Sequence, residues 1–172
     1  MFLSLFSFSF LSSRTELADK TRPQLQGSIA AMSTIMMPSL LSSPASADVL
    51  AKQWLQGFTR GKALGPSLAG LSLAVYSYLA YDARAKGDAK WLAWAAAGVL
   101  TISIVPFTLV FMDTTNQALI AAATGGSSKS LASGATSELV TKWKHLNLVR
   151  SVLPLTGTVV GFYGLLHSSN SL

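Results

Sequence analysis

The sequence predicts an all-α protein, a four-helix transmembrane bundle, and three observations lead to this prediction. Half of the 172 residues are hydrophobic and only 12% are charged, whereas soluble domains carry about 25% charged residues. The mean hydropathy is positive. The apolar residues are grouped into runs, several of which approach the roughly 20 residues that a helix needs to cross a bilayer. A soluble domain would require a mostly polar surface, so we expect an integral, multi-pass membrane protein.

The first predicted helix lies near residues 25–43 and is the shortest of the four. Its apolar sequence, GSIAAMSTIMMPSLL, covers only residues 27–41, which is short for a crossing. Residues 1–26 form a poorly defined N-terminal segment. They begin with MFLSLFSFSFLSS, which no basic residue precedes, so they make a poor signal peptide.

The second and third predicted helices lie near residues 63–82 and 90–113. Basic residues flank the second helix on its N-terminal side, and Asp82 and Arg84 follow it. The third contains WLAWAAAGVLTISIVPFTLVFM, a run without a charged residue that matches the length of a bilayer crossing. Both segments are therefore expected to span the membrane.

The fourth predicted helix lies near residues 143–167 and carries one charge, Arg150, in the first turn of its apolar run. Such a side chain can extend to the lipid headgroups. Gly157, Gly161 and Gly164 recur along the run, a pattern typical of closely packed membrane helices. The Gly- and Ser-rich residues 124–137 predict a flexible loop. The membrane domain is thus expected to cover residues 27–167, followed by a tail at 168–172.

The net charge of +6 does not point to nucleic acid. The basic residues are scattered in short clusters between apolar runs and form no basic stripe with interleaved aromatic residues. Charges that flank membrane spans explain them better. With four spans, six basic residues fall on each side of the membrane, so the positive-inside rule does not settle the orientation, and neither the organelle nor the oligomeric state follows from the sequence.

Unusual polar residues gather at the ends of the predicted spans that share one side of the membrane. Trp143, Asn147 and Arg150 stand at i, i+4 and i+7 and therefore lie on one helical face, with His145 on roughly the opposite face. The other members of this set are Trp54, Arg60, Asp113, Thr115 and Asn116. Interfacial anchors and helix caps are one explanation. A pocket for a flat, oxygen-bearing ligand is the other, because polar groups at membrane depth are costly unless they are used.

Four segments of the chain resemble the fungal anthrone oxygenases, small membrane proteins of aromatic polyketide biosynthesis. The segments are ADVLAKQW (47–54), RGKALGPSLA (60–69), PFTLVFMDTTNQAL (106–119) and KWKHLNLVRSVLPLTG (142–157). The resemblance covers about residues 27–166 and implies a four-helix membrane protein that oxidises an anthrone to an anthraquinone with molecular oxygen. The family motifs fall on Pro106, Phe107, Thr108, Thr115 and Asn116, and on Trp143, Asn147 and Arg150. The chain departs from the family in its first span, where TELADKTRPQLQ replaces a longer apolar lead.

We expect such an oxygenase to need neither a cofactor nor a metal. The sequence has no cysteine, only two histidines and no metal-binding spacing of histidine and glutamate. It also has no nucleotide-binding glycine motif. An anthrone can react without help from a cofactor, because loss of its benzylic proton gives an electron-rich anthrolate that passes an electron to oxygen.

The protein would then supply an oxyanion site, a base and a binding surface. Arg150, Asn147 and Asn116 are candidate donors to the enolate oxygen. His145 and Asp113 are the candidate bases, and the base stays unassigned. Trp143 and Trp54 are expected to stack on the tricyclic ring, with Arg60 and Thr115 as further substrate contacts.

Two other functions remain open at this point. A non-catalytic membrane accessory or scaffold of a secondary-metabolite pathway would need no pocket. A small transporter would place charged residues within its spans, a requirement that only Arg150 approaches. An apolar cavity between Arg60, Asn116, Trp143, Asn147 and Arg150 would favour the enzyme, and solid packing would favour the accessory.

Overall fold

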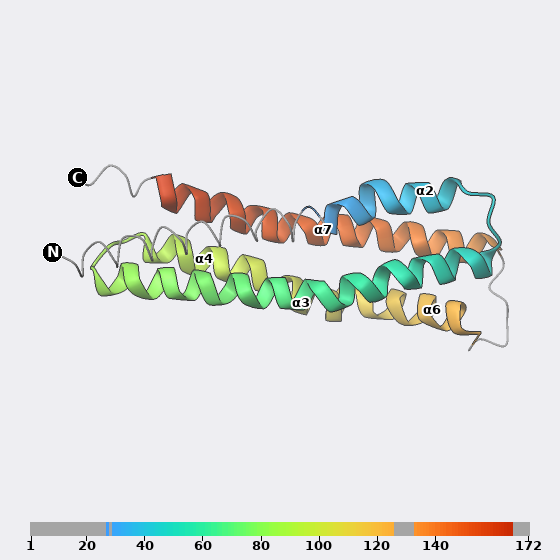
Figure 1. Ribbon diagram of the computed structural model, residues 1–172, viewed down its shortest axis with the longest axis horizontal. Coiled ribbons are helices and arrows are strands. Elements are labelled where there is room, and N and C mark those ends of the chain that lie inside the picture. Colours follow the sequence, from blue (N-terminus) through green and yellow to red (C-terminus); the bar gives the residue numbers. More distant parts are fainter. Residues whose placement is uncertain (1–26, 28, 126–132, 167–172) are drawn as a thin grey trace, which may run out of the picture.

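Helical rods packed side by side make up the protein (Figure 1). The computed structural model describes residue 27, residues 29–125 and residues 133–166, and all regular secondary structure in these ranges is helical. The first rod contains η1 (Met32–Met36) and α2 (Met37–Ser42), and the second is α3 (Ala47–Ala85). The third joins α4 (Trp91–Ile102), α5 (Ile104–Phe107), η2 (Thr108–Met112) and α6 (Asp113–Thr124), and the fourth is α7 (Ser133–Leu166). The predicted all-α, four-helix fold is confirmed.

The helices are longer than the apolar runs that predicted them. α3 begins at Ala47 and not near residue 63, the third rod continues to Thr124 and not to residue 113, and α7 begins at Ser133 and not near residue 143. The predicted loop at 124–137 is therefore wrong for residues 133–137, which are helical. Residues 126–132 lie outside the described part, as do the predicted segments 1–26 and 168–172. The extensions are amphipathic, so run length alone could not reveal them.

Three of the rods are long and apolar enough to cross a membrane, namely Ala47–Ala85, Trp91–Thr124 and Gly134–Leu166. The first rod, Ile29–Ser42, is apolar but shorter. The 39 residues of α3 extend for about 58 Å at 1.5 Å per residue, against a hydrocarbon core of about 30 Å. Each long rod therefore has a part that the bilayer would not cover.

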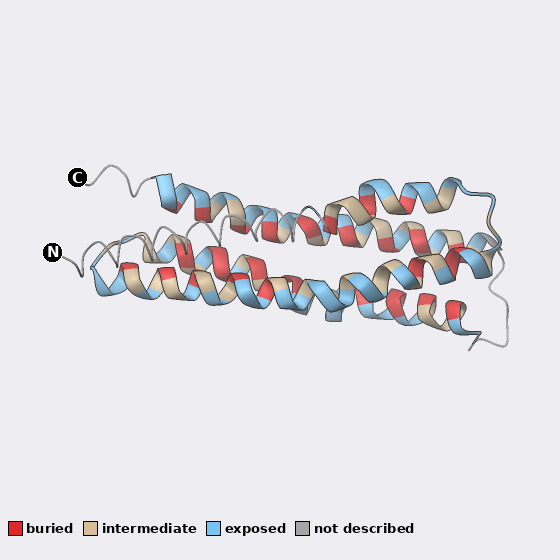
Figure 2. Ribbon diagram, viewed as in Figure 1, coloured by how far each residue is buried: buried red, intermediate tan, exposed pale blue. Residues whose placement is uncertain are grey.

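The exposed surface marks where that part begins. Most large exposed apolar side chains occur on α3 from Leu64 onward, on the third rod up to Phe111 and on α7 from Leu148 onward, and Ile35 and Val49 are the exceptions. Beyond these positions the exposed residues include Lys62, Asp113 and His145. Figure 2 shows buried residues on the inward faces along the whole bundle. The molecule thus has an apolar half and a more polar half that share one continuous interior.

Close contacts hold α3, α4 and α7 together in the apolar half. A side-chain carbon at Gly157 would lie 2.9 Å from the carbonyl oxygen of Ala97, and the Tyr76 hydroxyl donates to the carbonyl of Gly157 at 3.3 Å. A carbon at Gly164 would lie 3.3 Å from Cβ of Ala93. Glycine is needed where helix backbones approach this closely, which explains the glycine pattern of α7.

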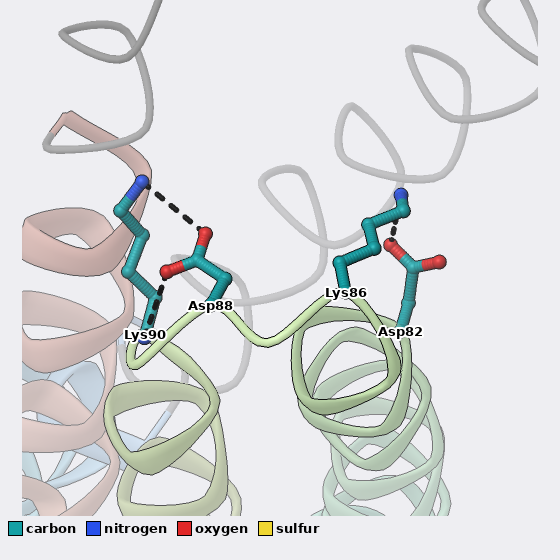
Figure 3. A network of polar contacts seen from close by, with 4 residues as sticks. All are labelled: Asp82, Lys86, Asp88 and Lys90. Atoms are coloured by element: carbon teal, nitrogen blue, oxygen red, sulfur yellow. Dashed lines mark hydrogen bonds and ion pairs between the residues drawn. The ribbon is translucent and has the colours of Figure 1, made fainter.

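The turn between α3 and α4 is fixed by local polar contacts (Figure 3). Gly87 adopts a positive φ of 71°, which glycine tolerates without strain. The Lys90 backbone N–H donates to Asp88 at 3.0 Å, and the Lys90 ammonium lies 3.3 Å from the same carboxylate. The backbone hydrogen bond and the positive charge of Lys90 lower the pKa of Asp88. Lys86 pairs with Asp82 at 2.7 Å one turn earlier.

Candidate functional site

Every rod departs from the regular α-helical hydrogen-bond pattern at a similar depth. Pro66 lies inside α3, Pro106 inside α5 and Pro154 inside α7, and each proline lacks the N–H that would bond to the carbonyl four residues earlier. The first and third rods contain the π-helical segments η1 and η2. π-Helical turns are rare in proteins overall, and those that occur often lie at functional sites. We therefore expect the functional residues to lie at this level.

Contacts between the rods establish that common depth. Arg150 of α7 bonds to Thr108, the first residue of η2. On the other side, Gly98 packs against Tyr76. α3 and the third rod run in opposite directions. Pro66 lies ten residues before Tyr76 in α3, and Thr108 lies ten residues after Gly98 in the third rod. Pro66 and Thr108 therefore lie at the same level. The breaks therefore surround Arg150.

Arg150 and Asn147 form the centre of a polar layer in this region. Arg150 donates through Nη1 to the Thr108 hydroxyl at 2.9 Å and through Nη2 to Oδ1 of Asn147 at 2.5 Å. Asn147 is fully buried, and its amide nitrogen donates to the Ile29 carbonyl and to the Ser33 hydroxyl, both at 2.8 Å. The first rod, η2 and α7 are thus linked by side chains at one level.

The Arg150 side chain does not behave as a headgroup anchor. It bonds inward to Thr108 and Asn147, and its Nε is buried without a hydrogen-bond partner. The three ion pairs identified between described residues are Lys52–Asp48, Lys86–Asp82 and Lys90–Asp88, none of which involves Arg150. Neutral oxygens therefore receive its hydrogen bonds. A partly buried cation without a counter-ion is costly and is well suited to receive an anion.

A second polar pair lies further along α7, toward the polar half. The Trp143 indole N–H donates to Oδ1 of Asn116 on α6 at 2.9 Å. Both side chains are buried, and so is the neighbouring Thr115. Asn116 is therefore within reach of Trp143 and is not bonded to Arg150. The structure brings Asn147 and Arg150 into one network and pairs Asn116 with Trp143 beside it.

Aromatic rings fill the interior beside this pair. Trp54 of α3 is fully buried and stacks on Phe58, with ring centroids 4.8 Å apart and an interplanar angle of 12°. Trp54 and Trp143 meet at 85° with their centroids 5.8 Å apart. Two perpendicular rings in contact leave no slot for a third ring between them, so the expected sandwich of the substrate by Trp54 and Trp143 is not present in this arrangement.

The remaining predicted residues lie outside the buried layer. Arg60, Asp113 and His145 are exposed. Asp113 accepts a hydrogen bond from Gln117 at 3.4 Å, and His145 lines a shallow surface depression of α7 together with Glu138 and Lys142. Neither candidate base therefore reaches the Arg150 network, and Arg60 does not contribute to it.

Two hydroxyl residues of the network were not expected from the sequence as site residues. Ser33 is an ordinary residue within an apolar run, and nothing in its spacing distinguishes it. Thr108 belongs to a family motif, but its contact with Arg150 joins residues 42 positions apart. Such pairings depend on how the rods are rotated and staggered, which single-helix periodicity does not fix.

Among the described residues, no group of three or more His, Cys, Asp or Glu side chains is placed to hold a metal ion. The buried polar groups of the layer are an arginine, amides and hydroxyls. These groups can donate hydrogen bonds to an oxyanion. They contribute no carboxylate, imidazole or thiolate for a transition metal.

Comparison with known proteins adds a family match. The family model described as anthrone oxygenase matches residues 54–160, a range that contains Trp54, Thr108, Asn116, Trp143, Asn147 and Arg150. No solved structure matches the chain.

Several relatives are similar over most of the chain. A noranthrone monooxygenase of Aspergillus flavus is 36% identical over 144 residues, which cover 81% of this chain and 67% of the relative. An anthrone oxygenase of Claviceps purpurea is 35% identical over 144 residues, covering 82% of each chain. The anthrone oxygenase dmxR16 of a Cryptosporiopsis species is 31% identical over 140 residues, covering 81% of this chain and 78% of the relative.

Proposed function

The chain belongs to the anthrone oxygenase family, and we infer that it converts an anthrone to an anthraquinone with molecular oxygen. The relatives are named for the oxidation of anthrones. The three long apolar helices favour action as an integral, multi-pass membrane protein. The substrate is then a small aromatic polyketide that dissolves in the lipid.

The observation that carries the proposal is the partly buried Arg150 guanidinium, which hydrogen-bonds only to neutral oxygens in the described structure. Loss of a benzylic proton places a negative charge on the anthrone oxygen. A preorganised cation and an adjacent amide stabilise such a charge far more strongly in a buried site than in water. Arg150 and Asn147 are therefore the proposed oxyanion donors.

The proposed reaction balances without a cofactor. The anthrone methylene loses a proton, and the resulting anthrolate transfers one electron to O₂. The substrate radical and superoxide couple at the same carbon, and a proton completes the hydroperoxide. Loss of the second proton of that carbon, with cleavage of the O–O bond, gives the new carbonyl group and water. One anthrone and one O₂ thus yield one anthraquinone and one H₂O.

The same residues set limits on the proton transfer. The described interior around Arg150 holds amides and hydroxyls, and both candidate bases are exposed. Stabilising the enolate lowers the pKa of the substrate methylene, so water becomes an adequate proton acceptor. We propose this substrate-centred acidification in place of a dedicated histidine or aspartate base.

Oxygen consumption by reconstituted protein tests the function. Proteoliposomes supplied with unsubstituted anthrone should take up O₂ faster than empty liposomes and form anthraquinone in a ratio of about one to one. The rate should be unchanged by EDTA, and the purified protein should contain no stoichiometric metal or flavin. Rates equal to the spontaneous oxidation would refute the enzyme. Activity lost on chelation and restored by one metal would refute the cofactor-independent reaction.

A membrane accessory is the second candidate, and the closed packing of the site favours it. Asn116, Trp143, Asn147 and Arg150 bond to one another or to their neighbours, so the described structure presents a packed layer whose polar groups are already engaged. An accessory would bind the anthrone or a soluble enzyme without accelerating oxidation. The oxygen measurement above separates the two functions.

A further inference from the structure

The packed layer raises the question of how a tricyclic substrate reaches it, which matters only if the proposed oxidation is correct. The amide nitrogen of Asn147 donates both of its hydrogens to the first rod, one to the carbonyl of Ile29 and one to the hydroxyl of Ser33. Those two oxygens occupy the position where a substrate oxygen would be needed. Asn147 therefore becomes available only if the first rod moves.

The contact between the first rod and α3 is suited to such movement. Met32 and Met36 project over Gly57 and Gly61 of α3, and a carbon added at Gly57 would collide with the thioether of Met36. Methionine is flexible and adapts to irregular space. Glycine offers a surface without side chains for it to cross. The seam formed by Met32, Met36, Gly57 and Gly61 is thus closed by movable groups.

Two unused polar atoms lie on the same face of α3 as the glycines. The Trp54 indole N–H and the side-chain oxygen Oε1 of Gln53 are buried without hydrogen-bond partners in the described structure. By the 3.6-residue period, positions 53, 54, 57, 58 and 61 fall within an arc of about 140°. Gly57 stands between the two polar residues on that arc. A buried N–H without an acceptor is costly, and a ligand oxygen would satisfy it.

The hydrophobic surroundings of these atoms suit a flat ring. Trp54 belongs to the buried core of the polar half, against which Met32, Met36 and Phe58 pack. Phe58 lies parallel to the Trp54 ring, so displacement of the methionines would uncover aromatic surface. Aromatic rings pack well against such a surface in offset or edge arrangements.

We propose that the seam between η1 and α3 is the entrance for the aromatic substrate. Met32 and Met36 are its movable closure, and the Trp54 N–H is the donor to a substrate oxygen. The hydrogen bond between Asn147 and Ser33 is the latch that holds the seam closed. Opening separates η1 from α3 and α7. The same movement breaks the bonds from Asn147 to Ile29 and Ser33. Entry of the substrate and release of an oxyanion donor are therefore one event.

The geometry of η1 supports this role. It is a π-helix with no side-chain cap, and π-helical turns occur frequently at functional sites. Beyond Met36 the rod continues as α2, which ends at Ser42, and Ser43–Ser46 then lead into α3. The rod therefore pivots on a short connection.

Site-specific thiol labelling tests the entrance, because the chain contains no cysteine. Met36→Cys places a single thiol in the seam, and Ile35→Cys places one on the exposed side of the same segment, where Ile35 is 67% exposed. Labelling by N-ethylmaleimide in proteoliposomes is timed with and without saturating anthraquinone. We expect protection of at least about threefold at Met36→Cys and none at Ile35→Cys. Equal rates at Met36→Cys with and without anthraquinone would overturn the entrance.

A second pair of variants tests the latch. Ser33→Ala removes one hydrogen bond from Asn147, and a typical net value for such a bond predicts about fivefold faster labelling of the thiol in the Met36→Cys background. Thr34→Ala is the control, because its hydroxyl bonds only within its own rod, to the carbonyl of Ala30. If Ser33→Ala labels no faster than Thr34→Ala, the Asn147–Ser33 bond does not hold the seam closed.

Trp54→Phe tests the donor, because phenylalanine keeps a ring at this position and lacks the N–H. We expect KM for anthrone to rise at least about twofold, the lower end of the value of one hydrogen bond, with kcat less affected. An unchanged KM would remove Trp54 from the proposal. If wild type accelerates anthrone oxidation while Met36→Cys is not protected, the entrance fails and the function stands. If wild type gives only the spontaneous rate, the proposed function fails.

Discussion

At the scale of single residues, the contacts of Arg150 decide between two roles for it, a membrane anchor and an oxyanion donor. Its spacing from Trp143 and Asn147 placed all three on one face, and the structure does hold Arg150 and Asn147 in contact. The spacing could not identify Ser33, Ile29 or Thr108 as partners, because those contacts cross between rods. Nor could it show that Trp54 and Trp143 meet edge to face.

Replacing Arg150 by lysine separates the two roles. An anchor tolerates lysine, since both side chains extend to headgroups. A donor to both Thr108 and Asn147 does not, because lysine lacks the planar fork that engages two oxygens together. We expect Arg150→Lys to insert and accumulate normally and to lose at least about tenfold in anthrone oxidation, equivalent to about 1.4 kcal/mol of transition-state stabilisation.

The measurement is initial O₂ uptake at matched protein amounts, after subtraction of the spontaneous rate. Asn147→Ala should also lose activity. Arg84→Lys is the matched control, since Arg84 lies over the Trp91 ring near the α3–α4 turn. Wild-type rates from both Arg150→Lys and Asn147→Ala would return these residues to a structural role.

At the scale of helices, the apolar runs predicted how many rods there are but not how far they extend. The run in the third rod stops at Met112, yet the rod continues through α6, whose buried side is formed by Thr115, Asn116, Leu119 and Ala123. α3 likewise buries Leu50 and Trp54 ahead of its apolar run. Amphipathic turns bury only one side, so their average hydropathy resembles that of a surface segment. The glycines of α7, by contrast, could be interpreted correctly because close helix contact has a specific residue requirement.

Gly157 provides the test at this scale. The Gly157→Ala methyl would meet the Ala97 carbonyl and the Thr101 hydroxyl, both at 2.9 Å, so α7 and α4 must separate. We expect a loss of about 1–3 kcal/mol in the free energy of unfolding. Gly70→Ala is the control, because nothing lies within 4 Å of its added carbon, and alanine should be neutral or stabilise the helix by up to about 1 kcal/mol. Detergent unfolding followed by tryptophan fluorescence measures both, and equal stabilities would argue against the tight contact.

At the scale of the whole molecule, the two halves of the bundle differ in what they can do. The apolar half is held by the glycine contacts of α7 with α4, and backbone-to-backbone contact of this kind leaves little freedom. The polar half contains η1, the methionine seam and the buried Trp54 and Trp143, and η2 lies at its border with the apolar half. The Arg150 layer lies where the halves meet. The apolar half is thus the more rigid part of the bundle, and the polar half is the more adaptable part.

The position of this layer relative to the exposed apolar surface has a kinetic consequence. The outer surface changes from apolar to polar near Leu64, Phe111 and Leu148, so the layer would lie close to one face of the bilayer. An anthrone partitions strongly from water into lipid, and the relevant substrate concentration becomes moles per mole of phospholipid. Below saturation, doubling the lipid at fixed protein and fixed total anthrone should therefore reduce the rate by about half. If the rate did not change with the amount of lipid, the substrate would be arriving through water. KM would then be an ordinary bulk concentration.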